Sequence, residues 1–189
     1  MARWEGNARG RLEQAALALF GEQGYEHTTV AQIAQRANLT ERTFYRWFSD
    51  KREVLFGASG DFEKQLVTAI EAVPADTAAL PTLLAAFTTL PDAIHSREFL
   101  RELSAVIAAS PALQERELTK QASVADAVAA ALVGRGCDAR TARLATDVGL
   151  AVLREVSQRW LAGEDMTEAY ETTVADLLAV TADARMPRR

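Results

Sequence analysis

Alanine constrains the fold of this chain more than any other residue, because it occurs 37 times in 189 residues. It has the highest intrinsic helix propensity, since it loses no side-chain entropy in a helix. Nowhere do β-branched residues alternate with polar ones between turns, which is the pattern of a half-buried strand. We therefore predict an all-α protein of about nine helices, and the 49% of apolar residues suffice for a sizeable core.

Charge divides the chain into two parts. Residues 1–56 carry eight basic and seven acidic side chains, whereas residues 57–189 carry thirteen basic and nineteen acidic ones. The net charge of −5 therefore belongs to the second part, and the chain is not a uniformly basic coat for nucleic acid. We expect two domains, a near-neutral module at 1–56 and an acidic helical domain at 57–189.

Several classes of protein are disfavoured by what the sequence lacks. Cys137 is a single cysteine, so there is no internal disulfide framework, and two histidines make a zinc site unexpected. His95 has no Ser or Cys nucleophile at a recognisable spacing, so we expect no enzyme. The sequence contains no Gly-rich phosphate loop and no metal-binding cluster, so we expect no cofactor and no metal. A redox role for Cys137 stays open. No stretch reaches the ~18 uninterrupted apolar residues that span a bilayer, and residues 5–7 are not the apolar run of a signal peptide. We expect a cytoplasmic protein without a membrane partner.

The N-terminal module shows a series of helix signals. Apolar residues at helical spacing predict a first helix around Leu12–Phe20. Thr29 and Gln32 have the spacing of a capping box and predict a second helix. Asn38 tolerates the left-handed conformation of a tight turn, and Thr40 is the expected N-cap of a third helix that runs to Phe48. A turn of about three residues between two helices is typical of a helix-turn-helix unit.

The third helix divides into two faces by its period. The inner face is expected to hold Phe44, Trp47 and Phe48. The outer face is expected to hold Arg42, Thr43, Tyr45, Arg46 and Ser49. Arginine can donate two hydrogen bonds to guanine, and Thr and Tyr hydroxyls can bind phosphate oxygens, so the outer face suits DNA. The alternative is an ordinary solvated face. A further helix is expected from Lys51, capped by Asp50, to about residue 72.

Several segments resemble the DNA-binding domain of TetR-family (tetracycline-repressor-like) transcriptional regulators. They are Ala15–Phe20, Gly24–Tyr25, Thr28–Ala34, Leu39–Phe48 and Lys51–Leu55, and the resemblance covers about residues 8–56. It implies a homodimer that binds a palindromic operator in double-stranded DNA, most often as a repressor that a small-molecule effector releases.

The resemblance also implies roles for single residues. The implied DNA contacts are Thr29, Thr40, Arg42, Thr43, Tyr45, Arg46 and Lys51. Arg42 and Arg46 would read the major groove, and Lys51 would bind a phosphate with help from the helix dipole. Arg9 and Arg11, expected ahead of the first helix, are additional candidates for arm contacts. The sequence departs from the family at Asn38, where glycine is common, and at Trp47, where tyrosine or histidine is usual.

The acidic domain is expected to contain helices near 77–95, 97–109, 111–133, 139–162 and 165–184. Residues 148–153 are apolar around the whole helix circumference, and the last helix has two apolar stripes, so both helices need partners on two sides. A four-helix dimer interface meets that need, and in the family these helices dimerise. The expected interface residues are Val148, Val152, Val156, Tyr170, Val174, Leu177 and Leu178. The alternative is core packing within one chain.

The remaining helices of such proteins enclose an effector pocket. Bulky apolar candidates for its lining are Phe62, Leu84, Phe87, Phe99, Leu103, Ile107 and Trp160. Residues 108–116 resemble a segment of TetR-type regulators with an MftR-like C-terminal domain, which implies an acyl-CoA or another long apolar effector. The main alternative function is a helical small-molecule-binding protein without specific DNA binding, and an enzyme is the third, disfavoured for want of a catalytic constellation.

Overall fold

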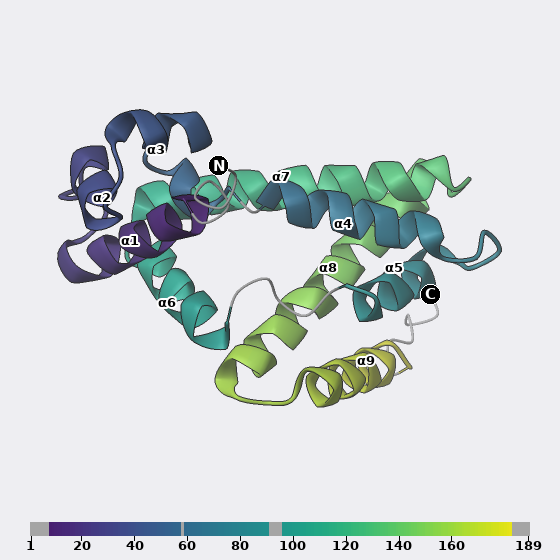
Figure 1. The fold of residues 1–189 in the computed structure, drawn as a ribbon. Coiled ribbons are helices and arrows are strands. Elements are labelled where there is room, and N and C mark those ends of the chain that lie inside the picture. The colour runs from purple at the N-terminus through teal and green to yellow at the C-terminus, as the bar shows by residue number, and fades with distance from the viewer. Residues whose placement is uncertain (1–7, 58, 91–95, 183–189) are drawn as a thin grey trace. The chain divides into compact units, whose positions relative to one another are not determined.

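The computed structural model describes residues 8–57, 59–90 and 96–182, and these ranges contain nine α-helices, one 3-10 helix and no strand (Figure 1). The all-α prediction is confirmed. The elements are α1 (Ala8–Gln23), α2 (Val30–Arg36), α3 (Glu41–Trp47), η1 (Glu53–Leu55), α4 (Ser59–Ala72), α5 (Ala79–Thr88), α6 (Arg97–Ala108), α7 (Pro111–Gly134), α8 (Ala139–Ala162) and α9 (Met166–Ala182).

The described residues form two compact units. Unit 1 contains the chain up to Glu63 together with Glu98–Ser123, and unit 2 contains Lys64–Arg97 together with the chain from Val124 onward. Most of α6 and the first half of α7 thus group with the N-terminal helices, although they lie beyond residue 56. The functional division at residue 56 stays a prediction.

Unit 1 has one hydrophobic core. Its fully buried members include Leu12 of α1, Ile33 of α2, Phe44 of α3 and Leu113 of α7. Phe99, Leu103 and Ile107 of α6 pack against the same core. An ion pair adds a polar link, because the Arg116 guanidinium donates to both carboxylate oxygens of Glu53, at 2.5 and 3.0 Å. The N-terminal helices are therefore stabilised by residues that come more than forty positions later.

Unit 2 is built around α8. Val152 and Val156 of α8 are buried with Ala169 of α9, and Leu84 of α5 packs against this cluster. Arg135, in the turn after α7, donates to the carbonyls of Ile70, Val73 and Pro74, so it satisfies acceptors at the C-terminal end of α4.

Helices α5 and α8 pack tightly at Gly149. A Cβ at this position would lie 2.7 Å from Leu83 Cδ1 and 3.3 Å from Leu83 Cβ. Leu83 is fully buried, so its side chain can make room only by displacing its own neighbours. We expect Gly149→Ala to lower the free energy of unfolding by about 1–3 kcal/mol. Gly60 of α4 is the matched control, because nothing lies within 4 Å of a Cβ there. Gly60→Ala should be neutral or stabilising, and urea unfolding measures both; equal midpoints for the two variants would contradict this prediction.

Two expected helices differ in the structure. The helix expected from Lys51 to about residue 72 is interrupted: η1 covers only Glu53–Leu55, and α4 begins at Ser59. Gly57 lies between these two helices, and a Cβ there would lie 2.8 Å from Phe48 Cε1, so the backbone passes close to this ring. The helix expected near 77–95 ends at Thr88, and residues 91–95, including His95, lie outside the described ranges.

No helix in the described ranges combines the length and the apolarity that crossing a bilayer requires. Within the same ranges, His, Cys, Asp and Glu side chains do not gather in threes in a way that could hold a metal ion.

Candidate nucleic-acid interface

Helices α2 and α3 form a capped helix-turn-helix unit. Thr29 and Gln32 make both halves of the predicted capping box: Gln32 N donates to Thr29 Oγ1 at 3.2 Å, and Thr29 N donates to Gln32 Oε1 at 2.8 Å. Thr43 N donates to Thr40 Oγ1 at 3.2 Å, which confirms Thr40 as the N-cap of α3. Asn38 has φ +53° in the turn between the helices. The predicted caps and turn are confirmed.

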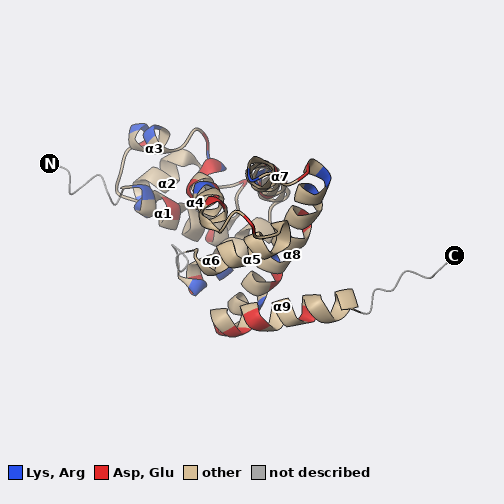
Figure 2. Cartoon of the chain, turned by 90° about the vertical axis from the view of Figure 1, so that its right-hand side faces the viewer, with Lys and Arg blue, Asp and Glu red and all other residues tan. Residues whose placement is uncertain are grey.

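The outer face of α3 is basic and aromatic. Figure 2 colours part of α3 blue, for Lys and Arg. Arg42, Tyr45 and Arg46 are exposed, Tyr45 by 56% of its surface, while Phe44 and Phe48 are buried beneath them. Arg42 pairs with no carboxylate in the described part of the chain. The face can therefore present a cation and a phenol to a ligand without first breaking a described ion pair of Arg42.

The expectation that Trp47 faces the core is wrong. It is 40% exposed, and the Arg46 guanidinium lies 5.9 Å from its ring centroid. Trp47 is the last residue of α3, and Phe48 already has extended backbone angles. The helix thus ends at Trp47, and the residue after it, Phe48, packs in the core together with Phe44. Trp47 joins the outer face, and sequence periodicity alone missed this.

Lys51 lies beneath the loop that precedes α2. Its ammonium donates to Tyr25 O at 2.7 Å and to Thr28 O at 2.9 Å, and it lies 4.0 Å from the centroid of the Tyr25 ring. Burial lowers the pKa of Lys51. Two of its three N–H groups are thus used inside the protein, so a phosphate contact there would rely on the third.

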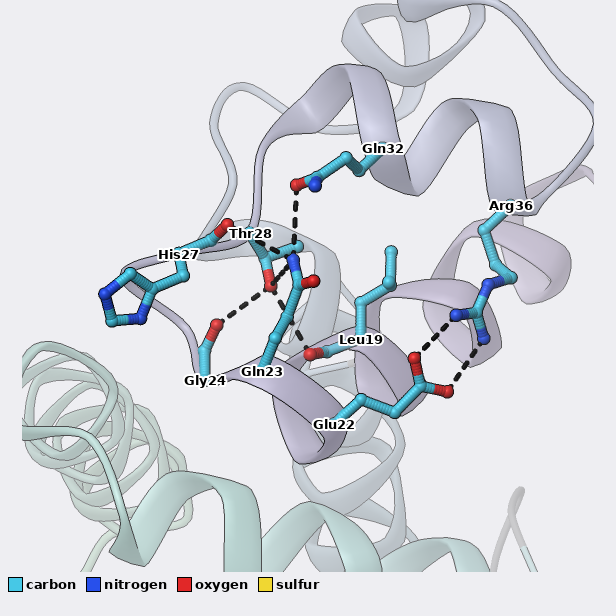
Figure 3. Close-up of polar contacts among 8 residues, drawn as sticks. All are labelled: Leu19, Glu22, Gln23, Gly24, His27, Thr28, Gln32 and Arg36. Atoms are coloured by element: carbon cyan, nitrogen blue, oxygen red, sulfur yellow. Dashed lines mark hydrogen bonds and ion pairs between the residues drawn. The ribbon is translucent and has the colours of Figure 1, made fainter.

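A polar network joins the end of α1 to the start of α2 (Figure 3). Gln23 Nε2 donates to Thr28 Oγ1 at 3.1 Å and to Gln32 Oε1 at 3.2 Å, and Figure 3 shows its side chain pointing at both. Nearby, Arg36 donates to both carboxylate oxygens of Glu22, and this hydrogen bond lowers the pKa of Glu22. Sequence reasoning missed Gln23, because no local pattern marks a contact made across a loop.

The two arginines expected ahead of the first helix lie inside α1. Arg9 Nε donates to Glu13 at 2.9 Å, and its Nη1 reaches Asp61 at 3.4 Å. Arg11 Nη2 donates to the carbonyls of Ala37 and Asn38, at the turn between α2 and α3. Their expected place as part of an arm is therefore corrected, because α1 begins at Ala8.

The structure distributes the seven effector candidates over both units. Phe62, Phe99, Leu103 and Ile107 belong to unit 1, and the last three pack against the core beneath α1. Leu84, Phe87 and Trp160 belong to unit 2. Trp160 is covered on one side by the Arg97 guanidinium, 5.0 Å from its centroid, and Arg97 also donates to Glu164 O at 2.9 Å.

The seven dimer candidates differ in exposure. Val152 and Val156 are buried within one chain, and Tyr170, Val174 and Leu177 pack against the cluster that contains them. Tyr170 also donates its hydroxyl to Leu84 O at 2.9 Å, and Val148 is half-buried. Leu178 is 63% exposed, and its neighbour Val180 is 71% exposed. Of the seven, Leu178 is thus the one that α9 presents outward.

Residues 13–58 match the sequence profile described as bacterial regulatory proteins, tetR family. A curated relative, the HTH-type transcriptional regulator TcmR of Streptomyces glaucescens, is 40% identical over 79 residues. These residues are 42% of this chain and 35% of TcmR, so the chain spans about a third of the length of that relative.

Solved structures match nearly the whole chain at low identity. A putative TetR-family transcriptional regulator from Syntrophomonas wolfei has a TM-score of 0.62 at 18% identity, over 97% of this chain and 99% of that one. The structure named SmeT-Triclosan complex has a TM-score of 0.53 at 21% identity, over 89% of this chain and 90% of SmeT. The sequence match thus covers residues 13–58, and at 18–21% identity the solved structures show that the described helices share the fold of these proteins.

Proposed function

We propose that the protein is a dimeric, ligand-responsive DNA-binding transcriptional regulator, and that it represses transcription from a palindromic operator. The observation that carries the proposal is the outer face of α3. This face belongs to a capped seven-residue helix, and Phe44 of the same helix is fully buried in the core. Its exposed residues are Arg42, Tyr45, Arg46 and Trp47. A short basic helix held rigidly from behind is what insertion into a major groove requires. A solvated face would not need the exposed aromatic residues.

The test is binding to a duplex that the wild-type protein enriches from a pool of random DNA. A scrambled duplex of the same length and composition serves as the reference. We expect clear preference for the enriched duplex, a strong decrease of affinity with salt, and an enriched sequence with two half-sites in inverted repeat. A protein that enriches no sequence would instead be a helical binding protein without specific DNA recognition.

Arg42 provides a sharper prediction about reading. Arg42→Ala should reduce the difference in binding free energy between the enriched and the scrambled duplex by about 1–3 kcal/mol for each base pair that Arg42 contacts. Arg140→Ala is the matched control, because Arg140 is an equally charged, exposed residue on α8. Salt titrations of both variants measure the effect. If Arg42→Ala instead weakened the affinity for both duplexes equally, and lowered the slope of log affinity against log salt concentration, Arg42 would be a phosphate contact.

The effector proposed is a largely apolar small molecule, and long-chain acyl-CoAs are the first compounds to test. Support comes from the resemblance of residues 108–116 and from SmeT, a protein of the same fold whose structure was solved as a complex with triclosan. Linkage requires that an effector that weakens DNA binding also bind the DNA-bound protein more weakly, by the same factor. Calorimetry with and without saturating enriched duplex measures this; an affinity that the duplex leaves unchanged would contradict release by that compound.

A further inference from the structure

Arg11 connects α1 with the turn of the helix-turn-helix unit. Its Nη2 donates to Ala37 O and, at 3.3 Å, to Asn38 O. We propose that Arg11 is a positioning residue for DNA reading: by holding these two carbonyls, it fixes the turn that sets α3 against α2. This inference rests on the proposed function, and it concerns a residue that contacts protein and not DNA.

The two carbonyls are acceptors that the helices leave without a donor. Ala37 is the C-cap residue of α2, and the turn's own hydrogen bonds run to earlier carbonyls: Asn38 N donates to Gln35 O and Leu39 N to Ala34 O. The last carbonyls of a helix lack intrahelical donors and carry the negative end of its dipole. A guanidinium placed there makes charge-assisted hydrogen bonds, which are stronger than neutral ones.

The turn also contains Asn38, whose backbone conformation can be stabilised by a hydrogen bond from outside the turn. Asn38 has φ +53°, a left-handed conformation that residues with a Cβ adopt at a cost and glycine adopts freely. Asparagine tolerates this conformation better than most residues, but it does not fix it. Arg11 binds the carbonyl of Asn38 itself, so the arginine stabilises a backbone conformation that still has a cost for a residue with a Cβ.

The decisive measurement is on Arg11→Gln in the full chain. Dissociation constants for the enriched and the scrambled duplex are determined over a range of salt concentrations. We expect the ratio of the two constants to shrink at least about tenfold, because Arg11→Gln removes both charge-assisted hydrogen bonds and the loss of one corresponds to about that factor. The slope of the logarithm of each dissociation constant against the logarithm of the salt concentration should not change. The ratio is taken from one preparation, so a smaller folded fraction alone does not alter it.

Asn38 offers a rescue that a merely stabilising arginine would not predict. Asn38→Gly alone should leave the ratio within about twofold of wild type, since glycine adopts the turn without strain. The double variant Arg11→Gln/Asn38→Gly should regain most of the lost ratio. Arg36→Gln is the charge-matched control: it removes a cation from α2 whose partner is the exposed Glu22, and it should leave the ratio unchanged.

Each remaining outcome overturns the inference. A salt slope that falls by about 0.9 for each half-site would make Arg11 a phosphate contact. An unchanged ratio in Arg11→Gln would show that Arg11 does not contribute to DNA reading. A double variant with a ratio no higher than that of Arg11→Gln would show that Arg11 does not act through the conformation of Asn38. If the wild-type protein enriches no sequence, the proposed function fails first, and this result is distinct from a failure of Arg11 alone.

Discussion

Replacing Phe44 by alanine is expected to lower the free energy of unfolding of unit 1 by about 3–5 kcal/mol. Phe44 is fully buried, and its ring centroid lies 5.5 Å from that of Tyr45 and 5.4 Å from that of Phe48. The loss is a large share of the ~5–15 kcal/mol that stabilises a typical domain. DNA binding should therefore disappear with the fold of α3, and urea unfolding followed by circular dichroism measures the loss.

Tyr45 is the control for this prediction, because it is the adjacent aromatic residue on the opposite face of α3. Tyr45→Ala removes a ring that is 56% exposed, so the unfolding midpoint should move little while the affinity for the enriched duplex falls. An unchanged midpoint for Phe44→Ala would show that α3 is not anchored through this ring.

Leu178→Glu is expected to convert the proposed dimer into monomers with an intact fold. Leu178 is exposed on α9, so a charge there is harmless in one chain but costly in a dehydrated interface. A monomer engages one half-site, and losing the second should weaken operator binding by about 10²–10⁴-fold. Sedimentation measures the assembly, and duplex titration measures the affinity.

Two variants separate this effect from a loss of fold. Leu177→Glu places its charge against the cluster of Val152, Val156 and Ala169, so it should lower the unfolding midpoint as well. Val133→Glu alters an exposed apolar residue of α7 and should leave a dimer. A wild-type protein that sediments as a monomer at micromolar concentration would contradict the proposal.

The sequence predicted most of the helices, and the caps of α2 and α3, because these depend on near neighbours. The residues of each capping interaction, Thr29 with Gln32 and Thr40 with Thr43, stand three positions apart, so local spacing suffices. The helix predicted near 139–162 has these bounds in the structure, where Asp138 caps its start and Gly163 follows its end. The basic outer face of α3 followed from the same short-range period.

Contacts between distant positions could not be predicted in this way. The carbonyls that Arg11 and Lys51 bind lie 23 to 27 positions away, and their acceptors are backbone atoms that carry no residue signature. The apolar pattern of α8 predicted partners on two of its sides, but it did not say which neighbours they are. Leu84 of α5 covers part of it within the same chain, which leaves Leu178 as the outward residue of the predicted dimer set.

The order of synthesis adds a consequence of the discontinuous make-up of unit 1. Val106 and Leu113 belong to the core beneath α1, yet a ribosome completes the helix-turn-helix unit long before it adds them. At about 5–20 residues per second, the nascent α1–α3 segment waits several seconds with part of its apolar surface uncovered. Nascent chains stalled before α6 should therefore be bound by chaperones or cleaved by proteases more readily than chains stalled after α7.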